Sequence, residues 1–191
     1  MLFHAIGLVL FIQNRENASL TYLNIALCGV VLLLAEIKQI KAFIPLILMF
    51  IGGYVIEYVG VHTGIFFGDY AYGDALGSKY LGIPIIIGIN WYAIVVSSAA
   101  VARKFTDNAT LRIILTALFC TLVDFLIEPV AIRFGFWNWK GGLIPWTNYL
   151  WWFLFSLGFA AVYLYTSRTR NRPAEMLWLI WVLFFILLNW F

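Results

Sequence analysis

The chain has 191 residues, of which 64% are hydrophobic and only 11% are charged, and its mean hydropathy is +0.94. Soluble globular domains carry about 25% charged residues, so this composition excludes that class and predicts a polytopic helical membrane protein. The net charge of +3 is expected to lie in loops, where it reports membrane topology and gives no reason to expect a nucleic-acid partner. We therefore expect an all-α transmembrane bundle of six to seven helices, forming a single integral membrane domain over residues 1–191.

Apolar residues fall into seven stretches along the chain. The first, Leu2–Ile12, would form a helix of about 17 Å, too short to cross about 30 Å of hydrocarbon unaided. The longer stretches are Leu20–Ala35, Phe43–Val61, Gly82–Ala102, Leu111–Ile132, Asn148–Thr166 and Glu175–Phe191. Two connectors between them are long, His62–Leu81 and Arg133–Thr147. We expect no cleavable signal peptide at Leu2–Ile12, because no basic residue precedes it and no small-residue cleavage site follows it.

Basic residues divide unequally between the two sets of connectors. One set carries Lys38, Lys41, Arg103, Lys104, Arg112, Arg168, Arg170 and Arg172, and the other carries Arg15, Lys79, Arg133 and Lys140. By the positive-inside rule the first set is cytoplasmic, so both long connectors face outward. We expect an integral protein of the cytoplasmic membrane of a prokaryote, surrounded by membrane lipid.

The stretch Leu111–Ile132 carries two acidic residues, Asp124 and Glu128. Their four-residue spacing places both on one face of a helix, about 6 Å apart along its axis. An ionised carboxylate near the middle of a bilayer costs roughly 2.5–3.5 kcal/mol, and no Lys or Arg follows Arg112 within the stretch. Pro129 supplies no N–H and clashes with the carbonyl one turn earlier, so we expect the helix to kink or end there.

Other polar residues fall in the same half of the membrane. Glu57 and Glu128 lie about 6 Å from the outer ends of their segments, and Asp124 lies about 12 Å from that end. Asn90 and Trp91 enter from the outer end of their own segment to about the level of Asp124. The coincidence of depth predicts a site inside the membrane.

Each of these features also has a structural explanation. A single intramembrane acid such as Glu57 is most often bonded to a neighbouring helix, and Asn90 can bond across helices in the same way. Trp137 and Trp139 could belong to an interfacial aromatic belt. The pair Gly52–Gly53 is expected to permit close helix packing.

The residue types available point to acid–base chemistry without a cofactor. The sequence holds no Walker loop, dinucleotide fingerprint, Ser/His/Asp arrangement or metal-ligand cluster, and His4 and His62 have no second ligand at a metal-binding spacing. Removal from water favours the protonated form of a carboxyl group, which makes it a potential general acid, and aromatic faces stabilise a nearby cation. These groups suit protonation of an isolated C=C bond in an apolar chain. Water or an internal alkene could then capture the tertiary carbocation.

Two ordered blocks of residues resemble a known family. The first block reads Glu57-x2-Gly60-x3-Gly64-x2-Phe67-Gly68-Asp69-Tyr70-Ala71-Tyr72, followed by Leu76-Gly77, Pro84 and Trp91. The second block reads Asp124-x3-Glu128-Pro129-x-Ala131, Trp137-x-Trp139 and Pro145-x2-Asn148. From Glu57 to Trp152, about half of the chain, the sequence resembles the membrane carotenoid-biosynthesis hydratases. Members of that family act as bisanhydrobacterioruberin hydratases or gamma-carotene-type 1′-hydratases.

The resemblance implies that water adds across the terminal isoprenoid double bond of an acyclic carotenoid and gives a tertiary alcohol without a redox cofactor. Such an enzyme is a cofactor-independent hydro-lyase. Asp124, Glu128 and Glu57 are then the candidate acids and bases. The residues expected to shape the end-group pocket are Tyr70, Tyr72, Trp91, Trp137, Trp139 and Asn148, together with Asn90 from its depth.

Other functions fit parts of the sequence. A carotenoid or isoprenoid end-group cyclase or isomerase would share the protonation step and differ only in what captures the cation. A retinal-type receptor needs an intramembrane Lys for its Schiff base, and the interiors of the six longer stretches contain none. A lipid or isoprenoid transporter would often show broken helices in matching halves, and apart from Pro129 we see no such pair.

Overall fold

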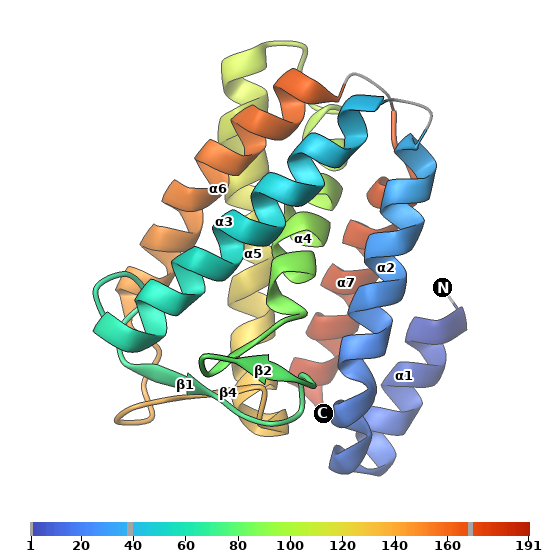
Figure 1. Cartoon of the computed structure of the whole chain (residues 1–191). Coiled ribbons are helices and arrows are strands. Elements are labelled where there is room, and N and C mark those ends of the chain that lie inside the picture. Colours follow the sequence, from blue (N-terminus) through green and yellow to red (C-terminus); the bar gives the residue numbers. More distant parts are fainter. Residues whose placement is uncertain (1, 38–39, 168–169) are drawn as a thin grey trace.

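The computed structural model describes residues 2–37, 40–167 and 170–191 as a helical bundle (Figure 1). Its α-helices are α1 (Leu2–Gln13), α2 (Thr21–Glu36), α3 (Phe43–Thr63), α4 (Ile87–Ala102), α5 (Ala109–Phe134), α6 (Trp146–Thr166) and α7 (Arg172–Trp190). Two 3₁₀ turns, η1 (Arg15–Leu20) and η2 (Ile40–Ala42), precede α2 and α3. The short strands are β1 (Tyr70–Tyr72), β2 (Lys79–Tyr80), β3 (Ile83–Pro84) and β4 (Trp137–Trp139). The predicted all-α fold is confirmed.

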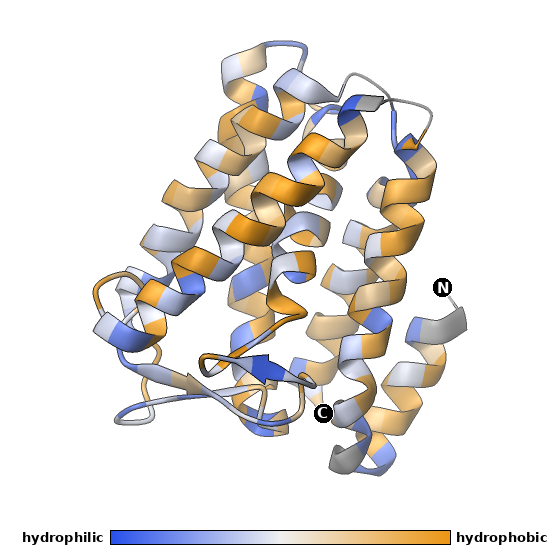
Figure 2. Cartoon of the chain, in the orientation of Figure 1, coloured by the Kyte–Doolittle hydropathy of each residue, from blue (hydrophilic) through white to orange (hydrophobic). Residues whose placement is uncertain are grey.

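The helices have the length and composition of membrane spans. Five helical segments are each long and apolar enough to cross a bilayer. They are α3, α5, α6, α7 and Asn17–Glu36, which consists of the end of η1 and the whole of α2. Figure 2 shows hydrophobic residues along the helices and hydrophilic residues mainly at the two ends of the bundle. The chain is therefore an integral membrane protein. α1, with 12 residues, stays below the spanning length, as expected for Leu2–Ile12.

α4 is the central helix of the bundle. Every residue from Trp91 to Ala102 is buried, and the helix contacts α2, α3, α5, α6 and α7. The run Ser97–Ala100 has only small side chains, which lets neighbouring helices approach closely. α4 thus carries Asn90 and Trp91 from one end of the bundle into its interior.

The predicted start of this helix at Gly82 is wrong, because α4 begins at Ile87. Leu81 and Gly82 have φ values of +48° and +82°, which a right-handed helix excludes. The residue before Pro84 is also biased towards extended backbone. These residues instead form the β2–β3 hairpin.

We expected the helix to kink or end at Pro129, and it does not end there, because α5 continues to Phe134. Val130 and Ala131 are completely buried beyond the proline, so burial holds the last turns in place. Asn189 on α7 donates to the carbonyl of Leu126 at 2.8 Å, next to the site of the missing N–H. Neighbouring helices in membrane proteins commonly satisfy backbone groups near a proline in this way.

The connectors gather at two ends, as the charge pattern predicts. The turns that join α2 to α3, α4 to α5 and α6 to α7 lie at one end, and the two long connectors lie at the other with η1 (Figure 1). Lys38 and Arg168 fall outside the described residues. The assignment of the more basic end to the cytoplasm stays a prediction.

Gly52 and Gly53 bring α3 against its neighbours. An ideal Cβ at Gly53 would lie 2.5 Å from Cδ1 of Trp91 on α4, and one at Gly52 would lie 3.0 Å from Cε1 of Phe159 on α6. Both distances are shorter than ordinary contacts, so these helices approach through bare backbone. The predicted role of the pair is confirmed.

We expect Gly53→Ala to lower the free energy of unfolding by about 1–3 kcal/mol, because the added methyl group must displace the Trp91 ring. Denaturant titration of the detergent-solubilised protein measures this change. Gly158→Ala is the matched control, since an ideal Cβ at Gly158 has no atom within 4 Å, and it should leave stability unchanged or raise it by up to about 1 kcal/mol, because Ala favours the helix over Gly. Equal effects of the two substitutions would contradict the packing argument.

Candidate active site

Two connectors that are far apart in sequence pair to form one side of the site. β1 and β4 run antiparallel, with Tyr70 opposite Trp139 and Tyr72 opposite Trp137. Side chains alternate along a strand, so these four rings share one face and Asn138 lies exposed on the other. Ring centroids are 5.0 Å apart in the first pair and 6.0 Å apart in the second. We call this two-stranded element the aromatic ribbon.

The tyrosines of the aromatic ribbon bind Glu57 on α3. Tyr70 and Tyr72 donate from their hydroxyl groups to one carboxyl oxygen at 2.5 and 2.8 Å. Trp91 donates from Nε1 to the other oxygen at 3.0 Å. Burial, followed by the neighbouring Glu57 charge, raises the pKa of both phenols well above its ordinary value of 10, so both remain O–H donors at physiological pH. Glu57 is 4% exposed and accepts three hydrogen bonds.

The tryptophans of the aromatic ribbon bind Glu128 on α5. Trp137 and Trp139 donate from Nε1 to the same oxygen of Glu128 at 3.0 and 2.8 Å. Asn148, in the first turn of α6, donates to the other oxygen at 3.2 Å and to Asp124 at 2.8 Å. Asp124 and Glu128 are each 1% exposed. One amide nitrogen therefore bridges two buried acids that lie one helical turn apart.

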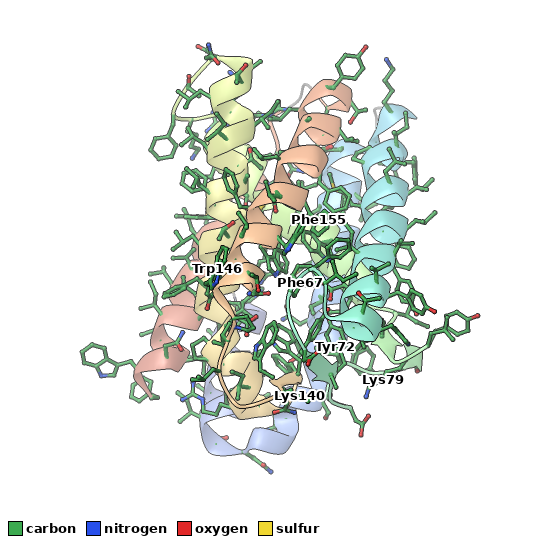
Figure 3. All side chains as sticks on the ribbon, turned by 90° about the vertical axis from the view of Figure 1, so that its left-hand side faces the viewer. Phe67, Tyr72, Lys79, Lys140, Trp146 and Phe155 are labelled. Atoms are coloured by element: carbon green, nitrogen blue, oxygen red, sulfur yellow. The ribbon has the colours of Figure 1, made fainter. Side chains whose placement is uncertain are left out.

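Neutral donors hold these acids in place of cations. Within the described residues, no Lys or Arg forms an ion pair with Glu57, Asp124 or Glu128. Lys79 and Lys140 lie at the end of the bundle that holds the two long connectors (Figure 3). Lys79 pairs with Asp74 at 2.7 Å, and Lys140 pairs with Asp69 at 3.5 Å. Nor does this part of the chain hold a group of three or more His, Cys, Asp or Glu placed to bind a metal ion.

The acids and their donors surround a small cavity of about 20 Å³, which we call the acid cavity. Its lining residues are Glu57, Phe67, Tyr70, Tyr72, Ile87, Asn90, Asp124, Glu128, Trp137, Trp139, Asn148 and Trp152. A cavity needs about 10–15 Å³ of probe-occupied volume to hold a water molecule. The acid cavity therefore has room for about one water, beside several polar groups.

The structure brings every predicted site residue together. All line the acid cavity except Trp91, which lies behind Glu57 as a hydrogen-bond donor. Their arrangement differs from the prediction in one respect. The polar atoms of Tyr70, Tyr72 and Asn148 point at the acids, whereas we predicted these residues only as walls of an end-group pocket.

Sequence reasoning missed Phe67, Ile87 and Trp152 as lining residues. Phe67 lies inside the first family block and packs with Phe155 between α3 and α6, their centroids 6.1 Å apart (Figure 3). Trp152 stacks on Trp91 with centroids 3.9 Å apart and ring planes 13° apart. No sequence signal separates this tryptophan from an interfacial one such as Trp146, which is 72% exposed.

Another buried acid, Glu36, was also missed because it follows the apolar stretch of α2. It is 1% exposed and lies near the opposite end of the bundle from the aromatic ribbon (Figure 1). Tyr163 on α6 and Asn171 at the start of α7 both donate to it. This contact ties α2, α6 and α7 together far from the acid cavity.

Comparison with known proteins gives a family match and a relative. Residues 17–191 match a family described as "Carotenoid biosynthesis protein", and this range includes the whole acid cavity. A protein of Haloarcula japonica named bisanhydrobacterioruberin hydratase is 31% identical over 122 residues, which are 60% of this chain and 42% of the relative. The match thus covers less than half the length of that relative. No solved structure matches the chain.

We expect Asn148→Ala to lower the free energy of unfolding by about 1–3 kcal/mol, because two buried carboxyl groups lose the donor they share. Denaturant titration in detergent measures the loss. Asn138→Ala removes an exposed amide from the other face of the aromatic ribbon and should have almost no effect. If Asn148→Ala were as stable as Asn138→Ala, the bridge would contribute nothing to the fold.

Proposed function

The chain belongs to the carotenoid biosynthesis protein family, and from this premise we propose that it is a hydratase acting on an acyclic carotenoid. Water adds across the terminal isoprenoid C=C bond and gives a tertiary alcohol, without a cofactor. The name of the H. japonica relative, bisanhydrobacterioruberin hydratase, supports hydration as the reaction. One observation carries the proposal: three buried acids with neutral hydrogen-bond donors surround a cavity with room for about one water.

Asp124 is the proton donor in this proposal. Within the described chain it accepts one hydrogen bond, whereas Glu57 and Glu128 accept three each. Hydrogen bonds donated to a carboxylate stabilise its ionised form, so they favour the ionised form of the two glutamates more than that of Asp124. Asp124 is the carboxyl group best equipped to keep a proton and transfer it.

The reaction then needs only these side chains and one water. The Asp124 proton moves to the less substituted carbon of the double bond, whose π electrons form the new C–H bond and leave a tertiary cation. The water oxygen bonds to the cationic carbon, and its extra proton passes to Glu128. Asp124 and Glu128 both line the acid cavity, so a water molecule held there can return the proton from Glu128 to Asp124 and the acids end as they began.

The tertiary cation is stabilised by its surroundings. Tyrosine and tryptophan faces attract a cation within about 6 Å of the ring centroid, worth about 0.5–2 kcal/mol each, and the aromatic ribbon presents four such rings. The Glu57 carboxyl group lines the same cavity. We assign Glu57 to charge stabilisation, since the three hydrogen bonds donated to it favour its carboxylate form.

The size of the acid cavity favours hydration over cyclisation. A cyclase would use the same protonation step and then fold an internal alkene onto the cation. About 20 Å³ beside the acids has room for the water molecule that hydration consumes, which a cyclase does not need.

Product analysis tests the proposed function. We expect cells that accumulate lycopene, when they express this protein, to make a pigment heavier by one water for each reacted end group. In deuterated water, each hydrated end should also gain one carbon-bound deuterium. Mass spectrometry of extracted pigments measures both changes. An unchanged pigment, or a product isomeric with lycopene, would contradict hydration.

We expect Asp124→Asn to lower the hydration rate at least about 100-fold, because it removes the proposed general acid. The variant should still fold, since an amide oxygen can accept the Asn148 hydrogen bond. Turnover of lycopene in detergent or nanodiscs measures the rate. Asp107→Asn, at an exposed aspartate that pairs with Arg112, is the matched control and should retain activity. Wild-type turnover by Asp124→Asn would show that another group donates the proton.

A further inference from the structure

A second cavity, of about 380 Å³, lies beside the acid cavity. This volume falls in the range of small-molecule binding sites. Its walls come from α1, α2, α4, α5, α7 and the connectors that carry Leu76 and Phe136. We call it the α1–α7 channel. An isoprenoid end group cannot fit the acid cavity alone, so a substrate must occupy other space next to the acids.

The channel and the acid cavity share part of their walls. Ile87, Asn90 and Trp137 line both spaces. Trp137 is also the indole that donates to Glu128 at 3.0 Å. An apolar molecule in the channel therefore ends against the same residues that border the acids.

The channel wall is built for an uncharged chain. Among its lining residues in the described part of the protein there is no Asp, Glu, Lys or Arg. Two of its polar side chains are already bonded: Trp181 donates to His4 at 3.1 Å, and Asn17 donates to the carbonyl of Leu10 at 3.0 Å. Phe11 on α1 and Phe184 on α7 both line it and pack edge to face, with their centroids 5.9 Å apart. A charged headgroup would lose its hydration here without gaining a partner.

The channel extends along α1 and opens on the outer surface of the helices. Phe11 and His4 both line it and lie seven residues apart, about 10 Å along α1. Ile6, Leu23 and Leu27 line the channel and are 47%, 52% and 42% exposed. The space therefore reaches the apolar outer surface of the helices, where membrane lipid lies.

From these contacts we infer that the α1–α7 channel binds the hydrocarbon chain of a long acyclic polyene, with the reacting end group against Asn90 and Trp137. The chain extends from there along α1 towards His4 and Trp181, and enters from the lipid between α1 and α2. This inference rests on the proposed function, because the hydratase assignment places the reacting double bond at the acid cavity.

Gly7→Leu tests the channel directly. Gly7 lines the channel, and an ideal Cβ there meets its nearest atom, Cε2 of Phe184, at 3.9 Å. A leucine at this position can therefore be accommodated and projects into the space that the chain needs. Gly158→Leu makes the same change on an exposed face of α6, where no atom lies within 4 Å of an ideal Cβ.

We expect Gly7→Leu to lower lycopene hydration at least about tenfold, because the leucine occupies the path of the chain. Hydration of a ten-carbon acyclic terpene with the same end group should stay near wild type, since Gly7 lies about 6 Å along α1 from Phe11 and a short substrate ends before it. Gly158→Leu should turn over both substrates normally. Wild-type lycopene turnover by Gly7→Leu, or equal loss on both substrates, would overturn the channel assignment.

A binding measurement separates this inference from the proposed function. Lycopene should quench tryptophan fluorescence in Asp124→Asn, because Trp137 and Trp181 line the channel. Adding Gly7→Leu to that variant should weaken lycopene binding at least about tenfold, and adding Gly158→Leu should not. If the wild-type protein made no alcohol but showed this pattern, the hydratase proposal would fail and the channel would stand. If Gly7→Leu left lycopene binding unchanged, the channel assignment would be wrong, whatever hydration rate the wild-type protein shows.

Discussion

Neutral N–H and O–H donors that hold three carboxyl groups inside the bundle are the contacts on which this structure depends. A buried carboxylate is costly in a membrane unless it is paired or hydrogen-bonded. Here the donors are two phenols, three indoles and one amide. Because none of them carries a charge, the acids keep their capacity to exchange protons, which an ion pair with Lys or Arg would suppress.

The aromatic ribbon explains how so many donors reach two helices at once. Each strand places two rings on one face, so β1 supplies both phenols to Glu57 and β4 supplies two indoles to Glu128. The pairing of the strands fixes the distance between the two sets. The ribbon therefore links α3 and α5 and lines the acid cavity. Because its strands are paired, the two connectors hold their four aromatic side chains at fixed positions beside Glu57 and Glu128.

The two ends of the bundle use buried acids differently. Glu36 accepts from Tyr163 and Asn171 and ties three helices together. Glu57, Asp124 and Glu128 border a space with room for water and adjoin an apolar channel. The same chemical group thus stabilises the fold at one end, and in our proposal performs chemistry at the other, because there it borders the acid cavity and the adjoining channel.

The sequence by itself determined the class of the fold, the helices to within a few residues at most ends, and the identity of the three acids and their aromatic neighbours. Long apolar runs and costly intramembrane charges are local signals, which a single chain displays without its partners. Only the tertiary structure decided that α5 passes through Pro129, that Tyr70 pairs with Trp139, and that Asn148 bridges two acids. Those outcomes depend on contacts between residues far apart in sequence, and spacing along one chain does not encode such distances.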